Sequence, residues 1–342
     1  METNQLNEEE LAQAVAILKA DGLVAFPTET VYGLGANALS TQAVKRVFEV
    51  KGRPSDNPLI VHVADFEQVK QYVDDFHPLT EKLVALYWPG PLTLIFKTKP
   101  NALPGVVSAG LSTVSFRMPK QEATLSLLRQ AQLPLVGPSA NTSGKPSPTT
   151  ADHVYHDLHG KIEAVLDGGA TSIGVESTVL DISNPDQPPM ILRPGAITKE
   201  QLERDLGVEV LVDGHLLTES EAPKSPGMKY KHYSPNTNVV MVRKGDWVQA
   251  VTAFKAQQAK IGIMAGPTVC EYLREDVAAI YCYQNDSVEA ATKGLFAGLR
   301  GLDEPTLQLD VILVAVYPEE QLGMAYMNRL KKAANQEYFI RQ

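Results

Sequence analysis

The chain has 342 residues, of which 44% are hydrophobic and 21% are charged, and its formal net charge is −9 at pH 7. This length accommodates two domains of an ordinary globular protein. The acidic balance argues against broad binding to a nucleic-acid backbone, and no apolar run approaches the ~18 residues of a membrane span. The two cysteines lack metal-ligand spacing and the N-terminus resembles no targeting signal, so we expect a reducing, cytoplasmic location.

The first 63 residues predict helices and strands around two polar segments, Pro27–Tyr32 and Lys51–Asn57. Ser40 is placed to N-cap the helix between these segments. Lys51 and Arg53 lie two residues apart where that helix ends, a pattern that suits a polyanionic small molecule. A solvated helix end is the alternative, because basic residues are common in a last turn. The elements expected here are helices at 7–21 and 40–51 and strands at 23–26 and 59–63.

Short strands continue to alternate with helices as far as residue 212. The expected strands are 92–97, 113–117, 133–136, 179–182, 191–192 and 208–212, and the expected helices are 65–73, 79–87, 122–130 and 198–206. Arg117 and Arg193 each fall at the end of a predicted strand. Chain segments that follow buried strands in this way carry the ligand-binding residues of open α/β sheets.

A second polar segment, Gly137–Thr149, follows the predicted strand 133–136 and contains Asn141 and Lys145. Loops of this composition offer backbone N–H groups to phosphate. The segment is neither a Walker A motif nor a dinucleotide fingerprint, and a flexible Ser/Pro linker is the alternative interpretation. The helix-like segment Asp152–His159 that follows carries three histidines, which we expect to form a polar helix surface rather than a metal site.

Residues 213–238 are expected to form a linker. Its segment Ser225–Pro235 packs two tyrosines, two lysines and a histidine between prolines, which favours a lid over a ligand pocket, with a plain tether as the alternative. Beyond it, strands at 239–242, 260–264, 278–281 and 311–314 alternate with helices at 247–258, 287–300 and 319–332. This order predicts a doubly wound parallel sheet. We therefore divide the chain into domains at 1–212 and 239–342 with the linker between them.

The polar segments together supply many cations and neutral donors but no recognisable nucleophile. The cations are Lys51, Arg53, Arg117, Lys145, Arg193, Lys229 and Lys231. No serine-histidine-aspartate context and no pair of catalytic carboxylates accompanies them. Such a site suits catalysis by positioning and charge stabilisation, as in nucleotidyl or phosphoryl transfer.

Several ordered motifs resemble the hallmark segments of YrdC-like domains. They are Phe26-Pro27-Thr28-Glu29-Thr30-Val31-Tyr32-Gly33-Leu34, Lys51-Gly52-Arg53-Pro54, Asn57-Pro58-Leu59, Ser139-Ala140-Asn141-Thr142-Ser143-Gly144 and Arg193-Pro194-Gly195. With the linker and the alternating C-terminal half, the whole chain resembles the long, two-domain form of the threonylcarbamoyl-AMP synthase family. The resemblance implies an α/β fold: a twisted mixed sheet with a concave basic pocket, followed by a smaller Rossmann-like domain.

The resemblance also implies an activity. Members of the family condense L-threonine, bicarbonate and ATP, with Mg²⁺, into threonylcarbamoyl-AMP and pyrophosphate. A separate threonylcarbamoyl transferase complex passes the product to a tRNA adenosine, so this complex is an expected partner, with a weak tRNA contact and no membrane contact. No protein-held metal site is expected.

By family likeness, individual residues receive roles. The expected catalytic residues are Lys51 and Arg53. The expected ATP-binding residues are Arg53, Asn57, Thr113, Asn141, Thr149, Arg193 and Tyr233. The expected threonine-binding residues are Thr30, His62, Arg117, Ser139 and Ser177, with Arg117 on the threonine carboxylate. For His62, a satisfied core residue is the open alternative.

Two other functions compete with this interpretation. An RNA-binding module with a basic cavity is disfavoured by the acidic net charge and by the absence of basic runs interleaved with aromatic residues. A carbamoyl transferase of metallocofactor assembly would carry zinc-finger cysteines and an additional acylphosphatase-like module, which this sequence lacks.

Overall fold

The computed structural model describes residues 2–214 and 233–341 of the chain. The described residues form two compact units: residues 2–143 with 147–214, and residues 233–341 with Gly144–Pro146. Most of the predicted linker, including Lys229 and Lys231, lies outside the described residues. Within the described ranges, none of the helices has the length and apolar character needed to cross a membrane.

The first unit is built on a mixed sheet of eleven strands in the order β1-β8-β2-β3-β7-β4-β6-β5-β9-β10-β11. The strands are β1 Asn4–Leu6, β2 Val24–Phe26, β3 Gly33–Asn37, β4 Ile60–His62, β5 Leu92–Lys97, β6 Thr113–Arg117, β7 Leu135–Val136, β8 Ala164–Leu166, β9 Thr178–Asp181, β10 Met190–Arg193 and β11 Leu211–Val212. The sheet contains both parallel pairs, such as β4 with β6, and antiparallel pairs, such as β2 with β3. The predicted mixed α/β sheet is thereby confirmed.

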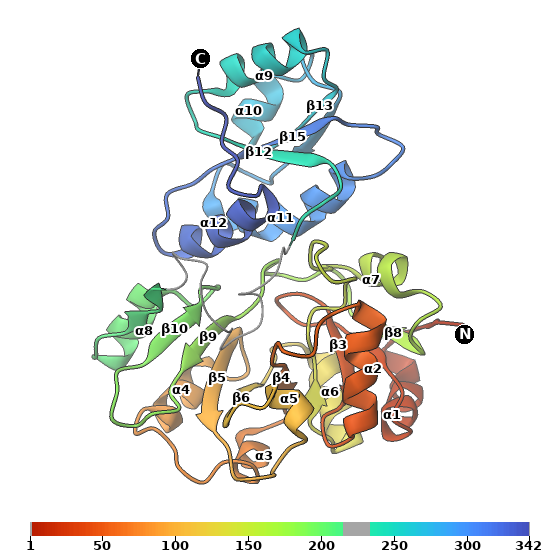
Figure 1. Cartoon of the computed structure of the whole chain (residues 1–342), viewed down its shortest axis with the longest axis vertical. Coiled ribbons are helices and arrows are strands. Elements are labelled where there is room, and N and C mark those ends of the chain that lie inside the picture. Colours follow the sequence, from red (N-terminus) through yellow and green to blue (C-terminus); the bar gives the residue numbers. More distant parts are fainter. Residues whose placement is uncertain (1, 215–232, 342) are drawn as a thin grey trace. The chain divides into compact units, whose positions relative to one another are not determined.

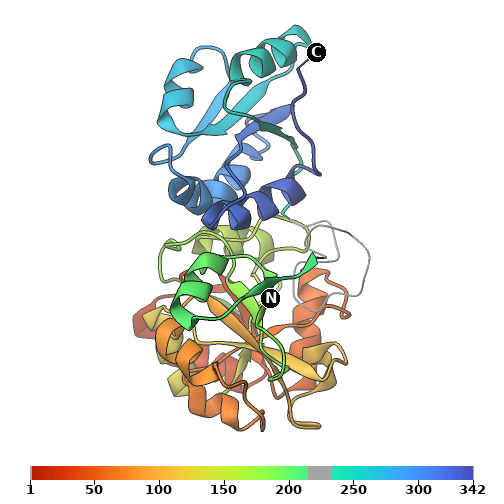
Figure 2. The ribbon, with the colours of Figure 1, turned by 90° about the vertical axis from the view of Figure 1, so that its left-hand side faces the viewer.

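Helices cover this sheet, as Figure 1 shows. They are η1 Glu8–Glu10, α1 Leu11–Lys19, α2 Thr41–Lys51, α3 Phe66–Lys70, α4 Thr80–Tyr87, α5 Gly105–Ser108, α6 Glu122–Ala131, α7 Ala151–Leu158 and α8 Lys199–Leu206. Helices α4 and α8 are neighbours (Figure 2), and the Tyr87 hydroxyl donates to the Asp205 carboxylate over 2.7 Å. This hydrogen bond joins two of the helices that cover the sheet.

Helix α2 has the limits that its sequence predicts. The Ser40 hydroxyl accepts the amide hydrogen of Ala43 at the N-terminus, over 3.2 Å. Gly52 ends the helix with a left-handed φ of 62°, which glycine adopts without strain. Lys51 is consequently held in the last turn, where its side chain is 2% exposed.

Strand β2 shows why the sheet is buried on both faces. Leu23 and Ala25 belong to one apolar cluster, whereas Val24 and Phe26 belong to the cluster on the other side. Alternate side chains of a strand point to opposite faces, so both faces must be covered by apolar partners. The strand is fully buried, and it delivers the chain to the polar Pro27–Tyr32 turn in a fixed position.

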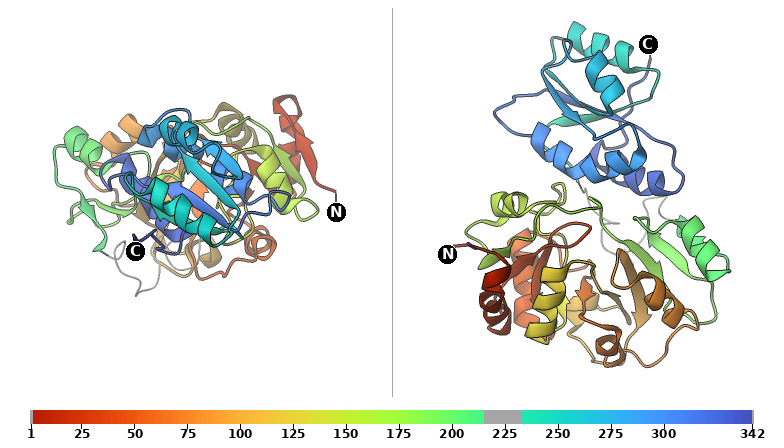
Figure 3. Two further views of the ribbon diagram at one scale, coloured as in Figure 1. Left: turned by 90° about the horizontal axis from the view of Figure 1, so that it is seen from above. Right: turned by 180° about the vertical axis from the view of Figure 1, so that it is seen from behind.

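The second unit is a four-stranded, entirely parallel sheet in the order β12-β15-β13-β14. Its strands are β12 Asn238–Val242, β13 Ile261–Ala265, β14 Ala279–Cys282 and β15 Val311–Ala315, and its helices are α9 Trp247–Ala256, α10 Pro267–Tyr272, α11 Val288–Leu302 and α12 Leu322–Ala333. Helices α9 and α10 lie on one side of this sheet and α11 and α12 on the other (Figures 1 and 3). The predicted parallel sheet is confirmed.

Candidate active site

Arg117 is the centre of a buried polar cluster at the end of β6. Its Nη1 donates to the Thr30 hydroxyl over 2.9 Å, and its Nε donates to the Gly90 carbonyl over 3.3 Å. Its Nη2 lies 2.7 Å from a carboxylate oxygen of Glu29, and Arg117 and Glu29 are 4% and 7% exposed. The structure thus brings together two predicted threonine-binding residues, Thr30 and Arg117, and adds Glu29.

His62 lies beside Arg117 because β4 and β6 pair in parallel with these two residues in register. Its ring meets the edge of Phe26 with 5.3 Å between ring centroids. A Cβ atom at Gly137 would come within 2.6 Å of His62 Nδ1, so the imidazole needs glycine at that position. Burial and the Arg117 guanidinium lower the pKa of His62 to about 3, which keeps the ring neutral.

The Nδ1 atom of His62 is buried and has no hydrogen-bond partner among the described residues. In a neutral imidazole this nitrogen either donates or accepts one hydrogen bond, depending on the tautomer. Backbone hydrogen bonds to Leu135 and Ile60 are among the influences on the pKa of His62, so the alternative of a core histidine stays open. Its geometry suits contact with a polar ligand group.

A second buried cation, Arg193, ends strand β10. Its Nη2 donates to the Ser177 hydroxyl over 3.0 Å and its Nε donates to the Ser177 carbonyl over 3.1 Å. The Ser177 hydroxyl also pairs with the Thr93 hydroxyl over 2.8 Å. Arg193 and Ser177, predicted for ATP and threonine respectively, are therefore direct neighbours.

Lys51 anchors the segment 137–149, here called the 137–149 loop. Its Nζ donates to the carbonyls of Ser139 and Asn141, the latter over 2.6 Å. A backbone hydrogen bond joins the same two segments: the Ser143 N–H donates to the Lys51 carbonyl over 2.8 Å. Lys51, Ser139 and Asn141 are thus brought together, with Lys51 acting on the loop that carries the other two.

Arg53 and Asn57 form a compact turn after α2. The Arg53 Nη2 donates to the carbonyls of Asn57 and Pro58 over 3.3 and 3.2 Å. Asn57 is fully buried, and neither polar atom of its side-chain amide has a hydrogen-bond partner among the described residues. An unsatisfied buried amide is costly, and a ligand that pairs with it would recover that cost.

The end of the 137–149 loop is held by other parts of the first unit. The Tyr32 N–H donates to the Pro148 carbonyl over 2.9 Å. The Ser147 hydroxyl donates to the buried Glu176 carboxylate over 2.5 Å. Thr149 contacts His153, whose Nδ1 accepts the Thr149 N–H over 3.2 Å. His153 therefore contacts the end of the loop.

Two further predicted ATP residues, Thr113 and Tyr233, belong to other elements. Thr113 starts the strand that Arg117 ends, and among residues 2–214 and 233–341 no side-chain hydrogen bond joins it to another predicted site residue. Tyr233 belongs to the second unit, where its ring packs on Phe296 with 5.1 Å between centroids.

The described residues offer no ready set of ligands to a resident metal ion. Within the described ranges, no group of three or more histidine, cysteine, aspartate or glutamate side chains is close enough to hold one. The buried carboxylates near the clusters are already engaged, Glu29 with Arg117 and Glu176 with Ser147. The described residues thus offer no such cluster for Mg²⁺, an ion that often binds through substrate phosphates.

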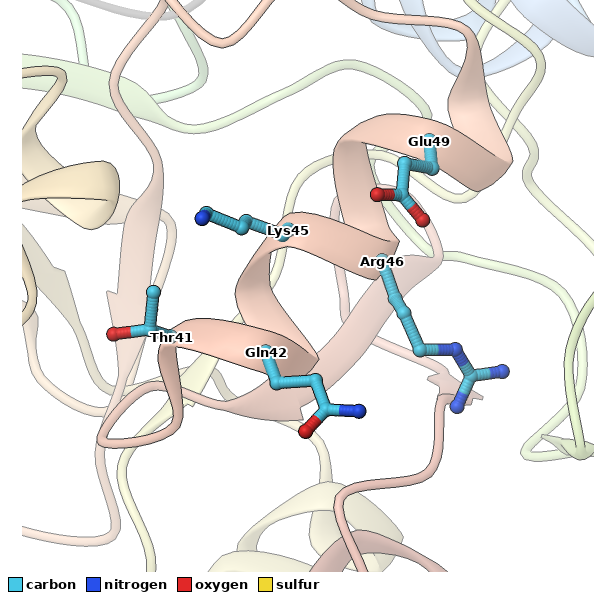
Figure 4. A pocket seen from close by; sticks show the side chains of 5 residues that line it. All are labelled: Thr41, Gln42, Lys45, Arg46 and Glu49. Carbon is cyan, nitrogen blue, oxygen red and sulfur yellow. The ribbon is translucent and has the colours of Figure 1, made fainter.

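The outer surface of α2 carries a separate shallow hollow, shown in Figure 4. It is lined by Thr41, Gln42, Lys45, Arg46 and Glu49. None of these is a predicted site residue, and the Arg46 guanidinium is paired with Glu163 over 2.9 Å. This hollow is not the candidate site.

Sequence reasoning missed three contributors to the clusters: Glu29, Thr93 and Glu176. Glu29 lies inside the Pro27–Tyr32 segment and is buried. A charged residue in this segment could have indicated a role in the site. Thr93 lies within strand β5 and meets Ser177 only through the fold, 84 residues away in sequence. No sequence signal pointed to it.

Two family models match the chain. One, described as "Telomere recombination" and covering the Sua5, YciO and YrdC proteins, matches residues 16–195. The other, described as the C-terminal domain of threonylcarbamoyl-AMP synthase, matches residues 197–335. The fold and these two matches define the class of protein: a two-domain α/β protein whose first domain is YrdC-like. The chain belongs to the Sua5/YrdC family, in its long form.

Full-length relatives agree with these matches. The threonylcarbamoyl-AMP synthase of Bacillus subtilis is 45% identical over 96% of this chain and 94% of its own length. The protein of the same name from Pyrococcus abyssi is 42% identical over 96% and 95%. The crystal structure of P. abyssi Sua5 complexed with L-threonine aligns with a TM-score of 0.90 at 41% identity, over 99% of both chains.

Proposed function

We propose that this protein condenses L-threonine, bicarbonate and ATP into L-threonylcarbamoyladenylate and pyrophosphate. The observation that supports this most is the Arg117 cluster, because a buried guanidinium beside a neutral imidazole, whose Nδ1 has no partner among the described residues, suits a hydroxy amino acid. A relative that covers 99% of this chain was crystallised with L-threonine. The product serves tRNA threonylcarbamoyladenosine formation through a separate transferase complex.

We assign threonine binding to the residues around Arg117. The guanidinium pairs with the threonine carboxylate, and Thr30 and His62 offer neutral hydrogen-bonding groups to the threonine hydroxyl. Because the pKa of His62 is lowered to about 3, the ring adds no charge at neutral pH. Ser139 and Ser177 complete the predicted threonine set.

We assign ATP binding to a second set of cations and amides. Arg53, Asn57, Asn141 and Arg193 contact ATP, with Thr113, Thr149 and Tyr233 as further nucleotide contacts. Lys51 holds the Ser139 and Asn141 carbonyls, so it fixes the loop as well as adding positive charge. The unsatisfied amide of Asn57 is the strongest local feature in favour of a ligand here.

The chemistry then needs position and charge rather than a protein nucleophile. The threonine amine and bicarbonate form a carbamate with loss of water. A carbamate oxygen attacks the α-phosphorus of ATP, and pyrophosphate leaves. Both reactants are anions, so Lys51, Arg53 and Arg193 offset their repulsion and stabilise the leaving group. Mg²⁺ enters with ATP and neutralises phosphate charge.

The test is pyrophosphate release from ATP and Mg²⁺, with threonine and bicarbonate omitted in turn. Release that requires both substrates supports the proposal, and release that requires neither contradicts it. Arg117→Met should raise the KM for threonine by at least about tenfold, the cost of one charge-assisted pair. Arg129→Ala, which breaks only an exposed pair with Glu122, is the matched control.

A further inference from the structure

The middle of the 137–149 loop makes its contacts in the second unit. Gly144–Pro146 cluster with residues 233–341, whereas residues up to Ser143 and from Ser147 cluster with the first unit. The loop carries Asn141 and Thr149, two of the proposed ATP residues. Three consecutive residues of a nucleotide loop are therefore held by the C-terminal domain.

The first unit holds the loop on either side of this middle part. At its start, the Ser143 N–H donates to the Lys51 carbonyl over 2.8 Å. At its end, the Tyr32 N–H donates to the Pro148 carbonyl over 2.9 Å. These bonds fix the beginning and the end of the loop but leave the conformation between them to other contacts.

Arg300 and two residues near the start of the second unit contact the middle part, with Lys145 donating to the Asn236 side chain. Its Nε and Nη2 both donate to the Pro146 carbonyl, over 3.1 and 2.6 Å. The Ser234 N–H donates to the Gly144 carbonyl over 2.8 Å. Gly144 has a φ of 89°, a conformation that glycine adopts readily, so the chain turns here without a side chain to hold it. A doubly donating guanidinium supplies a charge-assisted restraint at this turn.

The same end of α11 holds the chain segment that enters the C-terminal domain. Asp303, the C-cap residue of α11, accepts the N–H groups of Asn236 and Thr237 over 2.9 and 2.7 Å. Arg300 and Asp303 lie about one helical turn apart. One helix terminus therefore contacts both the middle of the loop and the last residues of the predicted linker.

We propose that Arg300 is a positioning residue for the nucleotide loop and that the C-terminal domain contributes to ATP binding through it. This inference rests on the proposed synthase function. A loop whose centre is restrained before ATP arrives loses less conformational entropy on binding. Removal of the Arg300 contact therefore weakens ATP binding and leaves the threonine cluster, built from the first unit, unchanged.

The experiment compares Arg300→Ala and Arg300→Lys with Arg274→Ala, an exposed arginine of the same domain, in the full-length protein. Hydrogen exchange of peptides covering residues 137–149 reports the loop directly, without substrate. We expect faster exchange in Arg300→Ala, a KM for ATP raised by about tenfold, and a KM for threonine changed by less than about twofold. Arg300→Lys, which retains one donor and the charge, should fall between Arg300→Ala and the wild type.

Loop exchange equal to that of the wild type in both Arg300 variants overturns the restraint. Faster exchange with an unchanged KM for ATP overturns its role in nucleotide binding. If Arg300→Ala fails to fold, the same two readouts on Arg300→Lys decide. If the wild type shows no release of pyrophosphate that depends on threonine and bicarbonate, the proposed function fails, while the exchange data still decide whether Arg300 restrains the loop.

Discussion

Arg117 and Glu29 form an ion pair that is almost completely removed from water, with 2.7 Å between Nη2 and the carboxylate oxygen. The contact lacks good hydrogen-bond geometry, because neither Glu29 oxygen nor Arg117 Nη2 has an aligned partner among the described residues. The carboxylate therefore balances the charge of the guanidinium without saturating its donors. Arg117 keeps capacity for a substrate anion while its net charge in the buried site is offset.

Glu29→Gln is expected to destabilise the folded protein. It removes the negative partner and leaves the Arg117 charge buried, a change that typically costs about 3–5 kcal/mol. Urea unfolding at pH 7 measures the loss. Glu67→Gln, which breaks an exposed pair with Lys70, should cost less than about 1 kcal/mol. Equal losses in the two variants would show that the buried pair carries no special stability.

His62 should make stability fall as the pH is lowered below 6. In the folded protein its pKa is about 3, whereas an unfolded histidine titrates near 6.5. Between these values the unfolded chain binds one more proton, so His62 alone removes about 1.4 kcal/mol of stability per pH unit. Above pH 6.5 this loss of stability does not occur, because His62 is then neutral in the folded and the unfolded chain.

Unfolding free energies of the wild type and His62→Gln at pH 7, 6 and 5 test this slope. The variant should lose less stability than the wild type over this range, whatever its stability at pH 7. His156→Gln is the control, because the His156 side chain is 75% exposed. Parallel curves for the wild type and His62→Gln would show that His62 titrates normally.

Lys51→Met should reduce pyrophosphate release by about 100-fold or more, a loss typical of removing one stabilising donor at a reacting phosphate. The variant keeps the length of the side chain but loses the donor to the carbonyls of Ser139 and Asn141. Initial rates at saturating substrates measure the effect. Lys45→Met, on the exposed face of the same helix, should retain normal rates, and near-normal rates in Lys51→Met would remove Lys51 from the mechanism.

Removal of divalent cations with EDTA should stop pyrophosphate release, and added Mg²⁺ should restore it. No cluster of metal ligands occurs among the described residues, so we expect the ion to enter bound to ATP. The Mg²⁺ concentration that gives half the maximal rate should then rise in proportion to the ATP concentration. A requirement that stays fixed at all ATP concentrations would instead indicate an ion bound to the protein itself.

Local signals predicted most regular elements of this protein. The strands Leu92–Lys97 and Thr113–Arg117 have the limits expected from their apolar runs. Strand β3, Gly33–Asn37, was not predicted because its sequence, GLGAN, has no β-branched residue. Its glycines are explained only by the fold, since a Cβ at Gly35 would lie 2.7 Å from the Val24 carbonyl oxygen of the paired strand.

The candidate site was predictable as a set of cations at strand and helix ends, but its internal pairing was not. Arg117 meets Glu29 and Thr30 only because β6 ends beside the turn after β2, far away in sequence. The contact of Arg300 with the Pro146 carbonyl is likewise set by tertiary structure, 154 residues apart. Sequence patterns identify residue types, whereas such pairs are determined by topology.

The order of strands in the first unit also has a consequence for protein synthesis. Strand β1, at residues 4–6, and one side of β2 both pair with β8, at residues 164–166. A growing chain must therefore expose these strand edges until β8 has been translated, and exposed edges promote pairing between chains. Arg193, a proposed ATP residue, is translated after β8. Truncated products should accordingly aggregate before they can bind substrate, so premature termination should yield insoluble protein rather than a partly active enzyme.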